Sequence, residues 1–231
     1  YTAKAGLPKS LEYYMIYPMQ LVMTMLIHFW NKIVSLFGIA DLLTADAVLA
    51  AVCMDISVYF AFKTVENILQ DTQKARVLLV FAALNPSIYL WGSYLYTHVV
   101  SLMFMTADIY FILRLKGAQK KEHVICCTAI VMVLSYCGAS IRSNGIFAIL
   151  ALAVCCMLDF QYLKKNKIRI VYYIVPSIMA LSLAVGGMHM AKSCYMKSEG
   201  VYEFDASDTK MPMVYWFLIG FSSGTGFPCF F

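Results

Sequence analysis

Long apolar runs separated by short polar breaks form the main pattern of this chain. Six of the runs approach the length of about 20 residues that an α-helix needs to cross the hydrocarbon core of a bilayer. The pattern therefore predicts an all-α integral membrane protein, a multi-spanning helical bundle of about six transmembrane helices. These helices are expected at residues 44–62, 77–95, 97–114, 123–141, 145–162 and 169–191.

The segment 17–37 has a different pattern, because polar residues recur within it at spacings of four and three. The polar positions are Gln20, Thr24, His28, Asn31 and Ser35. This spacing places them on one face of a helix, and such an amphipathic helix is expected to lie in the membrane interface with its apolar face down. We expect it on the outer surface. If it spanned the membrane instead, residues 1–13 would be cytoplasmic.

Lys and Arg are concentrated in three short clusters between the apolar runs. Because cytoplasmic loops of membrane proteins collect Lys and Arg, these basic clusters predict which loops lie inside the cell. The outer turns at 38–43 and 92–98 then contain no Lys or Arg, whereas Arg142 lies alone in the third outer turn. The clusters are Lys63/Lys74/Arg76, Arg114/Lys116/Lys120/Lys121 and Lys164/Lys165/Lys167/Arg169.

These expectations divide the chain into three parts. Residues 1–43 form an outer-face loop and the interfacial helix, and residues 44–191 form the transmembrane core. Residues 192–231 form an outer-face loop and the start of a juxtamembrane helix. The chain begins with Tyr1 and stops just after an aromatic run, so we interpret it as a fragment with a spanning segment missing upstream.

The composition agrees with a membrane protein. Apolar residues make up 61% of the chain and charged residues 13%, against roughly half and a quarter in soluble domains. The mean hydropathy is +0.72. The net charge of +5 belongs to the basic clusters, so it reports topology and not binding to nucleic acid. The eight cysteines fall mostly within apolar runs and show no metal-ligand spacing, so they do not form a disulfide scaffold.

Arg142 is the first candidate functional residue, because its position opposes the charge pattern that sets the topology. A guanidinium group matches the oxygens of a phosphate in a planar, bidentate geometry. Asn144 and Gly145 permit a tight turn, and the free N–H groups of the helix expected to start there also favour an anion. The alternative is an arginine that reaches lipid headgroups from a helix end.

Two further outer segments carry candidate residues. In the functional interpretation Tyr17 and Gln20 face a polar cavity, whereas in the structural one Tyr17-Pro18 is an ordinary helix start. Tyr96 and His98 lie at the second outer turn, where His98 could bind a metal, carry a proton or donate to a phosphate. A single histidine at a membrane turn is also common as a structural residue.

Two carboxylates lie within apolar segments, where such a group is costly and usually has a partner or a role. Asp55 is near the middle of its predicted helix, and Asp108 is closer to the cytoplasmic end, where it is expected to face water. A helix-packing hydrogen bond and a catalytic role are both open for these residues. The chain contains no glycine-rich phosphate loop, no nucleophile elbow and no HExxH zinc motif.

Four short motifs occur in register with the predicted outer turns. They are Tyr17-Pro18-Met19-Gln20 with Leu36-Phe37-Gly38, Asn85-Pro86 with Tyr94-Leu95-Tyr96-Thr97-His98, Ile141-Arg142-Ser143-Asn144-Gly145, and Met211-Pro212 with Trp216, Gly220 and Gly226. In this order they resemble the "YP-x-Q … FG", "YGD" or "YTD", "RPNG" and "P … W … GL … G" segments of bacterial polytopic glycosyltransferases of the GT-C fold. Those enzymes are relatives of the protein O-mannosyltransferases and the aminoarabinose transferases.

The resemblance implies an enzyme that moves a sugar from a polyprenyl-phosphate carrier to a glycan, lipid or protein acceptor. The reaction would take place at the outer face of the cell membrane, here a bacterial plasma membrane. The catalytic acid of such enzymes normally precedes the "YP-x-Q" helix, so we expect it upstream of Tyr1, outside this chain. The residues implied to bind substrate are Arg142, Asn144, Gly145, Tyr17, Gln20, His98 and Tyr96.

The chain departs from the family pattern at two positions. His98 stands where the family usually has Asp, which weakens the case for a metal at that turn. Ser143 replaces the proline of the arginine turn, which leaves the role implied for Arg142 intact. A divalent metal is therefore the one cofactor left open, and no cofactor follows from the residues themselves.

A transporter or lipid flippase is the main alternative function. Such proteins typically have helices broken near the midplane and paired inverted repeats. This chain offers one mid-helix carboxylate, Asp55, and its sequence shows no internal repeat, which weighs against that alternative. A third interpretation is a non-catalytic subunit of a membrane assembly. In that case the grouping of Tyr17, His98 and Arg142 on one face has no functional meaning.

Overall fold

The computed structural model describes residues 18–38, 41–92, 94–118, 120–142 and 167–198, together with residues 150 and 154. This part of the chain is helical and contains no strand, so the all-α class predicted from the sequence is confirmed for it. Its helices, in chain order, are α3 (Pro18–Ser35), α4 (Leu42–Leu69), α5 (Thr72–Leu84), α6 (Pro86–Gly92), α7 (Thr97–Gly117), α8 (Lys121–Ile141) and α11 (Lys167–Ser198).

Four of the described helices are long and apolar enough to cross a membrane. They cover Leu42–Leu69, Thr97–Leu115, Lys121–Ile141 and Val171–Ser198. These ranges overlap four of the six spans predicted from the apolar runs. Apart from residues 150 and 154, the predicted span 145–162 falls outside the described residues, so the predicted count of about six spans is not reached in the part that the structure describes.

The predicted span 77–95 is wrong as a single helix, because the chain breaks in its middle. Pro86 has no backbone N–H and disfavours helical geometry in the residue before it. Asn85 accordingly has an extended conformation, with φ −87° and ψ 107°, and ends α5. Its side-chain oxygen accepts a hydrogen bond from the Ser87 N–H at 3.0 Å at the start of α6. The 13 residues of α5 rise about 20 Å, less than the bilayer core of about 30 Å.

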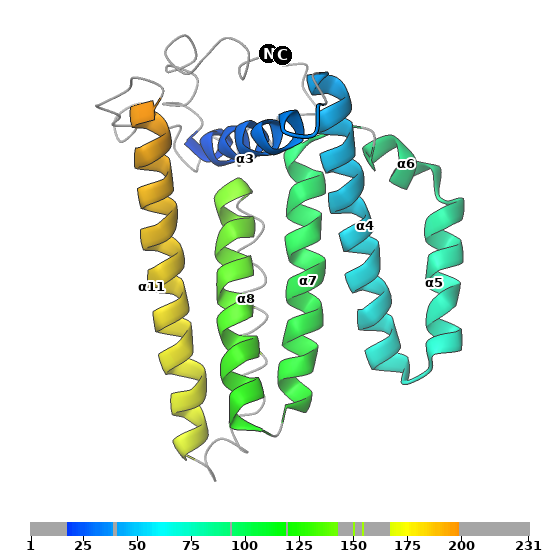
Figure 1. Cartoon of the computed structure of the whole chain (residues 1–231). Helices are drawn as coiled ribbons and strands as arrows, with labels where there is room; N and C mark the ends of the chain where they lie inside the picture. The colour runs from blue at the N-terminus through cyan, green and yellow to red at the C-terminus, as the bar shows by residue number, and fades with distance from the viewer. Residues whose placement is uncertain are drawn as a thin grey trace, which may run out of the picture.

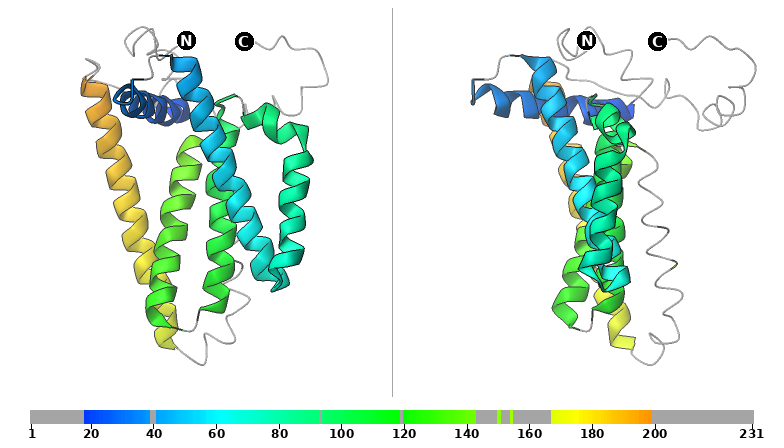
Figure 2. Two further views of the ribbon diagram at one scale, coloured as in Figure 1. Left: turned by 45° about the vertical axis from the view of Figure 1, so that its right-hand side comes forward. Right: turned by 90° about the vertical axis from the view of Figure 1, so that its right-hand side faces the viewer.

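The long helices lie side by side in one layer. Across this layer the order is α11, α8, α7 and α4, with α5 beyond α4 (Figure 1). Turned by 90° in Figure 2, the same helices overlap in a narrow band, as expected for a single layer seen edge-on. α3 runs crosswise over the ends of α7 and α8 instead of alongside them (Figure 1). This orientation is the one expected of an interfacial helix.

Two of the basic clusters, and the start of the helix that carries the described part of the third, lie at one end of the layer, which we call the basic end. The turn between α4 and α5, the turn between α7 and α8, and the start of α11 all lie there (Figure 1). The opposite end, crossed by α3, is called the α3 end. Arg142 directly follows the last residue of α8 and therefore lies at the α3 end. The first two basic clusters thus share one end, whereas Lys32 of α3 and Lys192 and Lys197 of α11 lie at the α3 end with Arg142.

Asp71 caps α5 at the basic end. Its carboxylate accepts hydrogen bonds from the N–H groups of Gln73 at 2.9 Å and Lys74 at 3.2 Å. These bonds, the one from Lys74 first, hold the pKa of Asp71 below its ordinary value. Because the folded-state pKa is lowered, the cap contributes stability at neutral pH. That contribution is lost as the pH falls through the folded-state pKa.

α7 and α8 form a tightly packed antiparallel pair in the centre of the layer. Several buried residues of α8 are small, and small residues let neighbouring helices approach closely in a membrane. They recur at spacings of three and four, at Val124, Thr128, Val131, Ser135 and Gly138. Toward the basic end, Ile112 and Leu115 of α7 belong to the same apolar cluster as Val124 and Val131 of α8.

α3 is attached to the layer by apolar packing and by side-chain contacts. Trp30 Nε1 donates a hydrogen bond to the Ala45 carbonyl at 2.7 Å, which ties α3 to the first turn of α4. His28 lies against Tyr195 of α11, with ring centroids 5.5 Å apart. The polar stripe predicted for α3 therefore takes part in packing. The buried apolar cluster beneath α3 consists of Val22, Met23, Leu49, Cys53, Met54, Val99, Val100 and Ile141.

We expect the basic end to be cytoplasmic and the α3 end to face outward. In a Cys229→Ser background, a membrane-impermeant maleimide added to intact cells should label Cys194, which is exposed near the α3 end of α11. Cys194→Ser should remove that label. In the double-serine background, Lys120→Cys should be labelled only after the cells are permeabilised. Labelling of position 120 in intact cells would contradict this topology.

Trp30→Phe should loosen α3 from α4. The substitution keeps an aromatic ring but removes the hydrogen bond to the Ala45 carbonyl, so we expect a loss of about 1 kcal/mol of stability. Thermal unfolding of the full chain in detergent measures this loss. Ser35→Ala is the matched control, because its hydroxyl donates only to the Lys32 carbonyl at the exposed end of the same helix. Equal effects of the two substitutions would show that the Trp30 bond does not hold α3.

Candidate functional site

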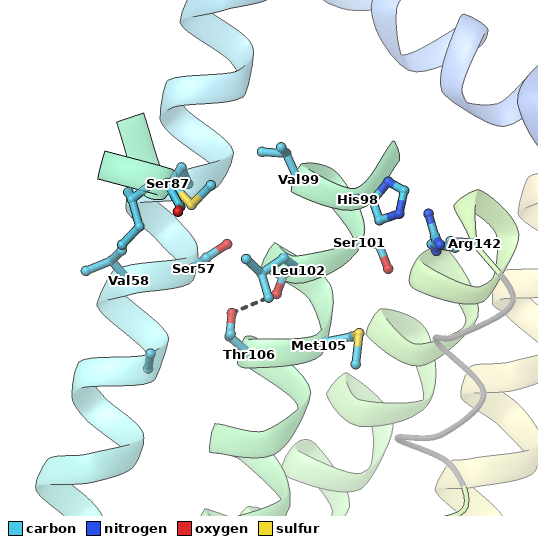
Figure 3. Close-up of a pocket in the computed structure, with 13 residues that line it drawn as sticks. Ser57, Val58, Ser87, His98, Val99, Ser101, Leu102, Met105, Thr106 and Arg142 are labelled. Atoms are coloured by element: carbon cyan, nitrogen blue, oxygen red, sulfur yellow. Dashed lines mark hydrogen bonds between the residues drawn. The ribbon is translucent and has the colours of Figure 1, made fainter. Parts of the chain in front are cut away.

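A cavity of about 510 Å³ lies between α4 and α7 and extends to the α3 end of the layer (Figure 3). α6 and the residue that follows α8 complete its wall. The lining residues are Met54, Ser57, Val58 and Ala61 of α4, Ser87 and Ile88 of α6, His98, Val99, Ser101, Leu102, Met105 and Thr106 of α7, and Arg142.

The polar end of the cavity lies where α7 begins and α8 ends. His98 is the second residue of α7, and Arg142 is the C-cap of α8. The backbone of Arg142 is extended, with φ −151° and ψ 132°, so its side chain leaves the helix. In Figure 3 the guanidinium of Arg142 points toward the imidazole of His98, and Ser101 lies one turn further along α7. Three polar side chains from two helices therefore converge.

Positive potential dominates the polar end. The N-terminus of a helix carries a partial positive charge, and the N-cap of α7, Tyr96, provides no side-chain hydrogen bond to it. Arg142 adds a full charge, which the last carbonyls of α8 offset only in part. None of the described lining residues is Asp or Glu. The polar end therefore favours an anion.

The remainder of the cavity is apolar. Its walls are mainly the side chains of Met54, Val58, Ala61, Val99, Leu102 and Met105. Two hydroxyls in this region bond to their own helices: Ser57 donates to the Cys53 carbonyl at 2.7 Å, and Thr106 donates to the Leu102 carbonyl at 3.0 Å. Their hydrogen-bonding capacity is thus partly used, and the body of the cavity suits a hydrocarbon. A polar end joined to an apolar body fits an amphipathic ligand.

The structure brings together some of the substrate-binding residues predicted from the sequence. Arg142 and His98 both line the cavity. Tyr96 stacks on His98 with ring centroids 4.9 Å apart and an interplanar angle of 11°, and so restricts the imidazole. Gln20 is half-buried on α3 and does not line the cavity. Tyr17, Asn144 and Gly145 lie outside the described residues, as does the helix start predicted at the last two.

The two intramembrane carboxylates have different surroundings. Asp108 does not face water, so that prediction is wrong: it is 1% exposed between α7 and α8. Ser135 Oγ donates a hydrogen bond to Asp108 Oδ2 at 3.0 Å. Of the two roles left open by the sequence, Asp108 therefore has the helix-packing hydrogen bond. Asp55 is exposed on α4. Neither carboxylate lines the cavity.

The divalent metal left open by the sequence has no ligand set in the described part of the chain. There, no three His, Cys, Asp or Glu side chains lie close enough together to hold a metal ion. Among the described lining residues, His98 is the only one of these four types. A guanidinium beside an imidazole and a helix N-terminus matches a phosphate and not a cation.

Neither the apolar body of the cavity nor the position of Ser101 is predicted from the sequence. A signal was present, because Met54, Ser57, Val58 and Ala61 recur at helical spacing on one face of α4. The same holds for His98, Ser101, Leu102 and Met105 on α7. Such stripes also occur in ordinary helix packing. Only the packing of α4 beside α7 shows that these two stripes enclose a cavity.

The described part of the chain is all-helical, with four helices able to cross a membrane and an amphipathic cavity between two of them. Comparisons of this chain with known protein families, with curated proteins and with solved structures found no match. Function is therefore inferred from the residues of the cavity.

Proposed function

We propose that this chain is the core of a membrane glycosyltransferase that takes a sugar from a polyprenyl-phosphate carrier at the outer membrane face. The observation that carries the proposal is the amphipathic cavity: Arg142 and His98 lie at one end, and apolar side chains fill the rest. A polyprenyl phosphate has the same division, with an anionic head and a long hydrocarbon chain. The motifs in the sequence that resemble GT-C glycosyltransferases point to the same ligand.

The carrier phosphate would bind at the polar end. Arg142 can offer two parallel N–H donors to two phosphate oxygens, which gives both affinity and orientation. His98 can donate a third hydrogen bond, and the N-terminus of α7 favours the same charge. Charge-assisted hydrogen bonds of this kind are about twice as strong as those between neutral groups.

The polyprenyl chain would lie along the apolar body of the cavity, between α4 and α7. Burying apolar surface stabilises a complex by roughly 25 cal/mol per Å². Met54, Leu102 and Met105 offer flexible or branched surfaces that adapt to an unsaturated hydrocarbon. The apolar contacts supply affinity for any prenyl chain, and the phosphate end supplies selectivity for the charged carrier.

In the transfer reaction, the acceptor hydroxyl oxygen forms a bond to the anomeric carbon of the sugar. The bond between that carbon and the carrier phosphate oxygen breaks, and the phosphate keeps the electron pair. The hydroxyl proton passes to a carboxylate base, the catalytic acid that the resemblance implies. Arg142 would stabilise the negative charge that develops on the departing phosphate, the role of a pre-positioned cation.

The position of Arg142 favours this function over a transporter. Arg142 follows the last residue of α8, at an end of the helical layer. A transporter's central site is expected near the midpoint of its spanning helices. A helix-end arginine directed into an apolar cavity is better placed to hold a lipid headgroup.

Arg142→Ala in the full-length protein should lower sugar transfer by roughly 100-fold or more, because the leaving phosphate loses its cation. Transfer from a radiolabelled polyprenyl-phosphate sugar measures the effect, and membrane insertion should be normal. Arg114→Ala is the control, since Arg114 lies at the basic end and contacts Tyr110 through its guanidinium. Near-full activity of the Arg142 variant would sink the proposed phosphate role.

Ala61→Trp should fill part of the apolar body of the cavity and weaken the binding of any prenyl chain. Overpacking costs of about 1–3 kcal/mol correspond to roughly 5-fold to 150-fold in affinity. Binding of a polyprenyl phosphate and of the uncharged polyprenol should fall together, because the change is remote from the charged end. Ala51→Trp, on an exposed part of the same helix, should change neither affinity. Unchanged binding by the Ala61 variant would place the hydrocarbon elsewhere.

A further inference from the structure

Asp108 and Ser135 form a buried hydrogen bond between α7 and α8 that the proposed reaction does not use. Asp108 is 1% exposed and Ser135 is fully buried. The donor–acceptor distance is 3.0 Å, between Ser135 Oγ and Asp108 Oδ2. The other carboxyl oxygen, Oδ1, has no hydrogen-bond partner in the described part of the chain. A carboxyl group in this position is costly, so its presence calls for a role.

The bond can form at one alignment of the two helices. α7 and α8 run in opposite directions and are joined by a short turn (Figure 1). Sliding one helix by a turn moves a side chain by about 5.4 Å, which separates a 3.0 Å donor–acceptor pair completely. Apolar residues in the same interface, such as Val131, can pack against several neighbours and select the alignment only weakly.

The same alignment sets the polar end of the cavity. Seven residues before Asp108 is Ser101, and seven residues after Ser135 is Arg142. Seven residues are close to two helical turns, or about 10.5 Å, so Ser101 lies on the same face of α7 as Asp108, and Arg142 follows the end of α8 at about the same height. His98 lies one further turn along that face of α7. Figure 3 shows the result: Ser101 and His98 on α7 lie opposite Arg142.

We propose that the Asp108–Ser135 hydrogen bond locks the alignment of α7 and α8 and thereby positions Arg142 against His98. Asp108 is then a positioning residue, about two turns away from the phosphate and not in contact with it. This inference rests on the proposed function for the identity of the anion. Both the phosphate site and its alignment require that the two donors, Arg142 and His98, face one another at a fixed separation.

A role in positioning and a role in stability have different consequences. Buried polar pairs can often be replaced by apolar residues of similar volume without loss of stability, while the alignment they specified is lost. Asp108→Leu is such a replacement, and the freed Ser135 hydroxyl can bond to a carbonyl of its own helix. We therefore expect Asp108→Leu to fold and to bind prenyl chains, but to lose the geometry of the phosphate site.

The experiment compares two probes that differ only in the charged head: a polyprenyl phosphate and the corresponding polyprenol, bound to the full-length protein in nanodiscs. Asp108→Leu and Ser135→Ala should each reduce the preference for the phosphate by about tenfold, with polyprenol affinity unchanged. Asp108→Asn should keep the preference, because its amide oxygen can accept the Ser135 hydrogen bond. General loosening of the bundle would weaken the binding of both probes, and the Asp108→Asn variant would show the same loss.

Thr128→Val is the matched control. Thr128 is fully buried in the same interface, seven residues before Ser135 toward the basic end, and is not a partner of Asp108. Its substitution should leave the phosphate preference within about twofold of the original. A loss as large as that of Ser135→Ala would overturn the proposal. Ser135→Ala removes a single hydroxyl, so the comparison stands even if Asp108→Leu fails to fold.

Arg142→Ala separates this inference from the proposed function. If Arg142→Ala and Asp108→Leu both abolish the phosphate preference, both are supported. If Arg142→Ala abolishes it and neither Asp108→Leu nor Ser135→Ala changes it, the lock is wrong and the phosphate site stands. If Arg142→Ala leaves the preference unchanged, the phosphate site itself is wrong.

Discussion

The close packing of α7 against α8 is the constraint on which the rest of the described structure depends. Small and β-branched residues along α8, from Val124 to Gly138, let the two helices approach. α4 then packs on the far side of α7, and α11 packs on the far side of α8 (Figure 1). The polar end of the cavity combines the first turn of α7 with the residue after the last turn of α8. Any change in how these two helices align would therefore reach the site directly.

The electrostatics of the site follow from the antiparallel arrangement. The positive N-terminus of α7 and the negative C-terminus of α8 meet at the same end of the layer. Arg142 is stabilised by the carbonyls that end its own helix, as an ordinary C-terminal cation would be. Its side chain nevertheless points into a cavity whose described lining has no carboxylate, beside His98. The local dipole accounts for a cation at this helix end, and the cavity accounts for the direction of its side chain.

The sequence predicts the helical class and the position of Arg142 at the end of α8, because each depends on local pattern. It predicts the span 77–95 wrongly, since apolar composition continues through a break that Asn85 and Pro86 impose on the backbone. It places Asp108 in water, since burial depends on which face of α7 meets α8. The cavity is not predicted for the same reason: the stripes on α4 and α7 are visible in the sequence, but the packing of one against the other is not. Properties of single segments are predictable here, and relations between segments are not.

That distinction also explains why a polar pair is suited to set helix alignment in a membrane. In water, burial of an apolar stripe drives helices together and selects which faces meet. In lipid the surrounding chains are as apolar as leucine, so this selection is weak and close packing and hydrogen bonds must supply it. The interface of α7 and α8 contains both: small residues that permit approach, and the Asp108–Ser135 bond, which forms at a single alignment. An apolar interface alone could hold the helices together, but it would leave the separation of His98 and Arg142 poorly defined.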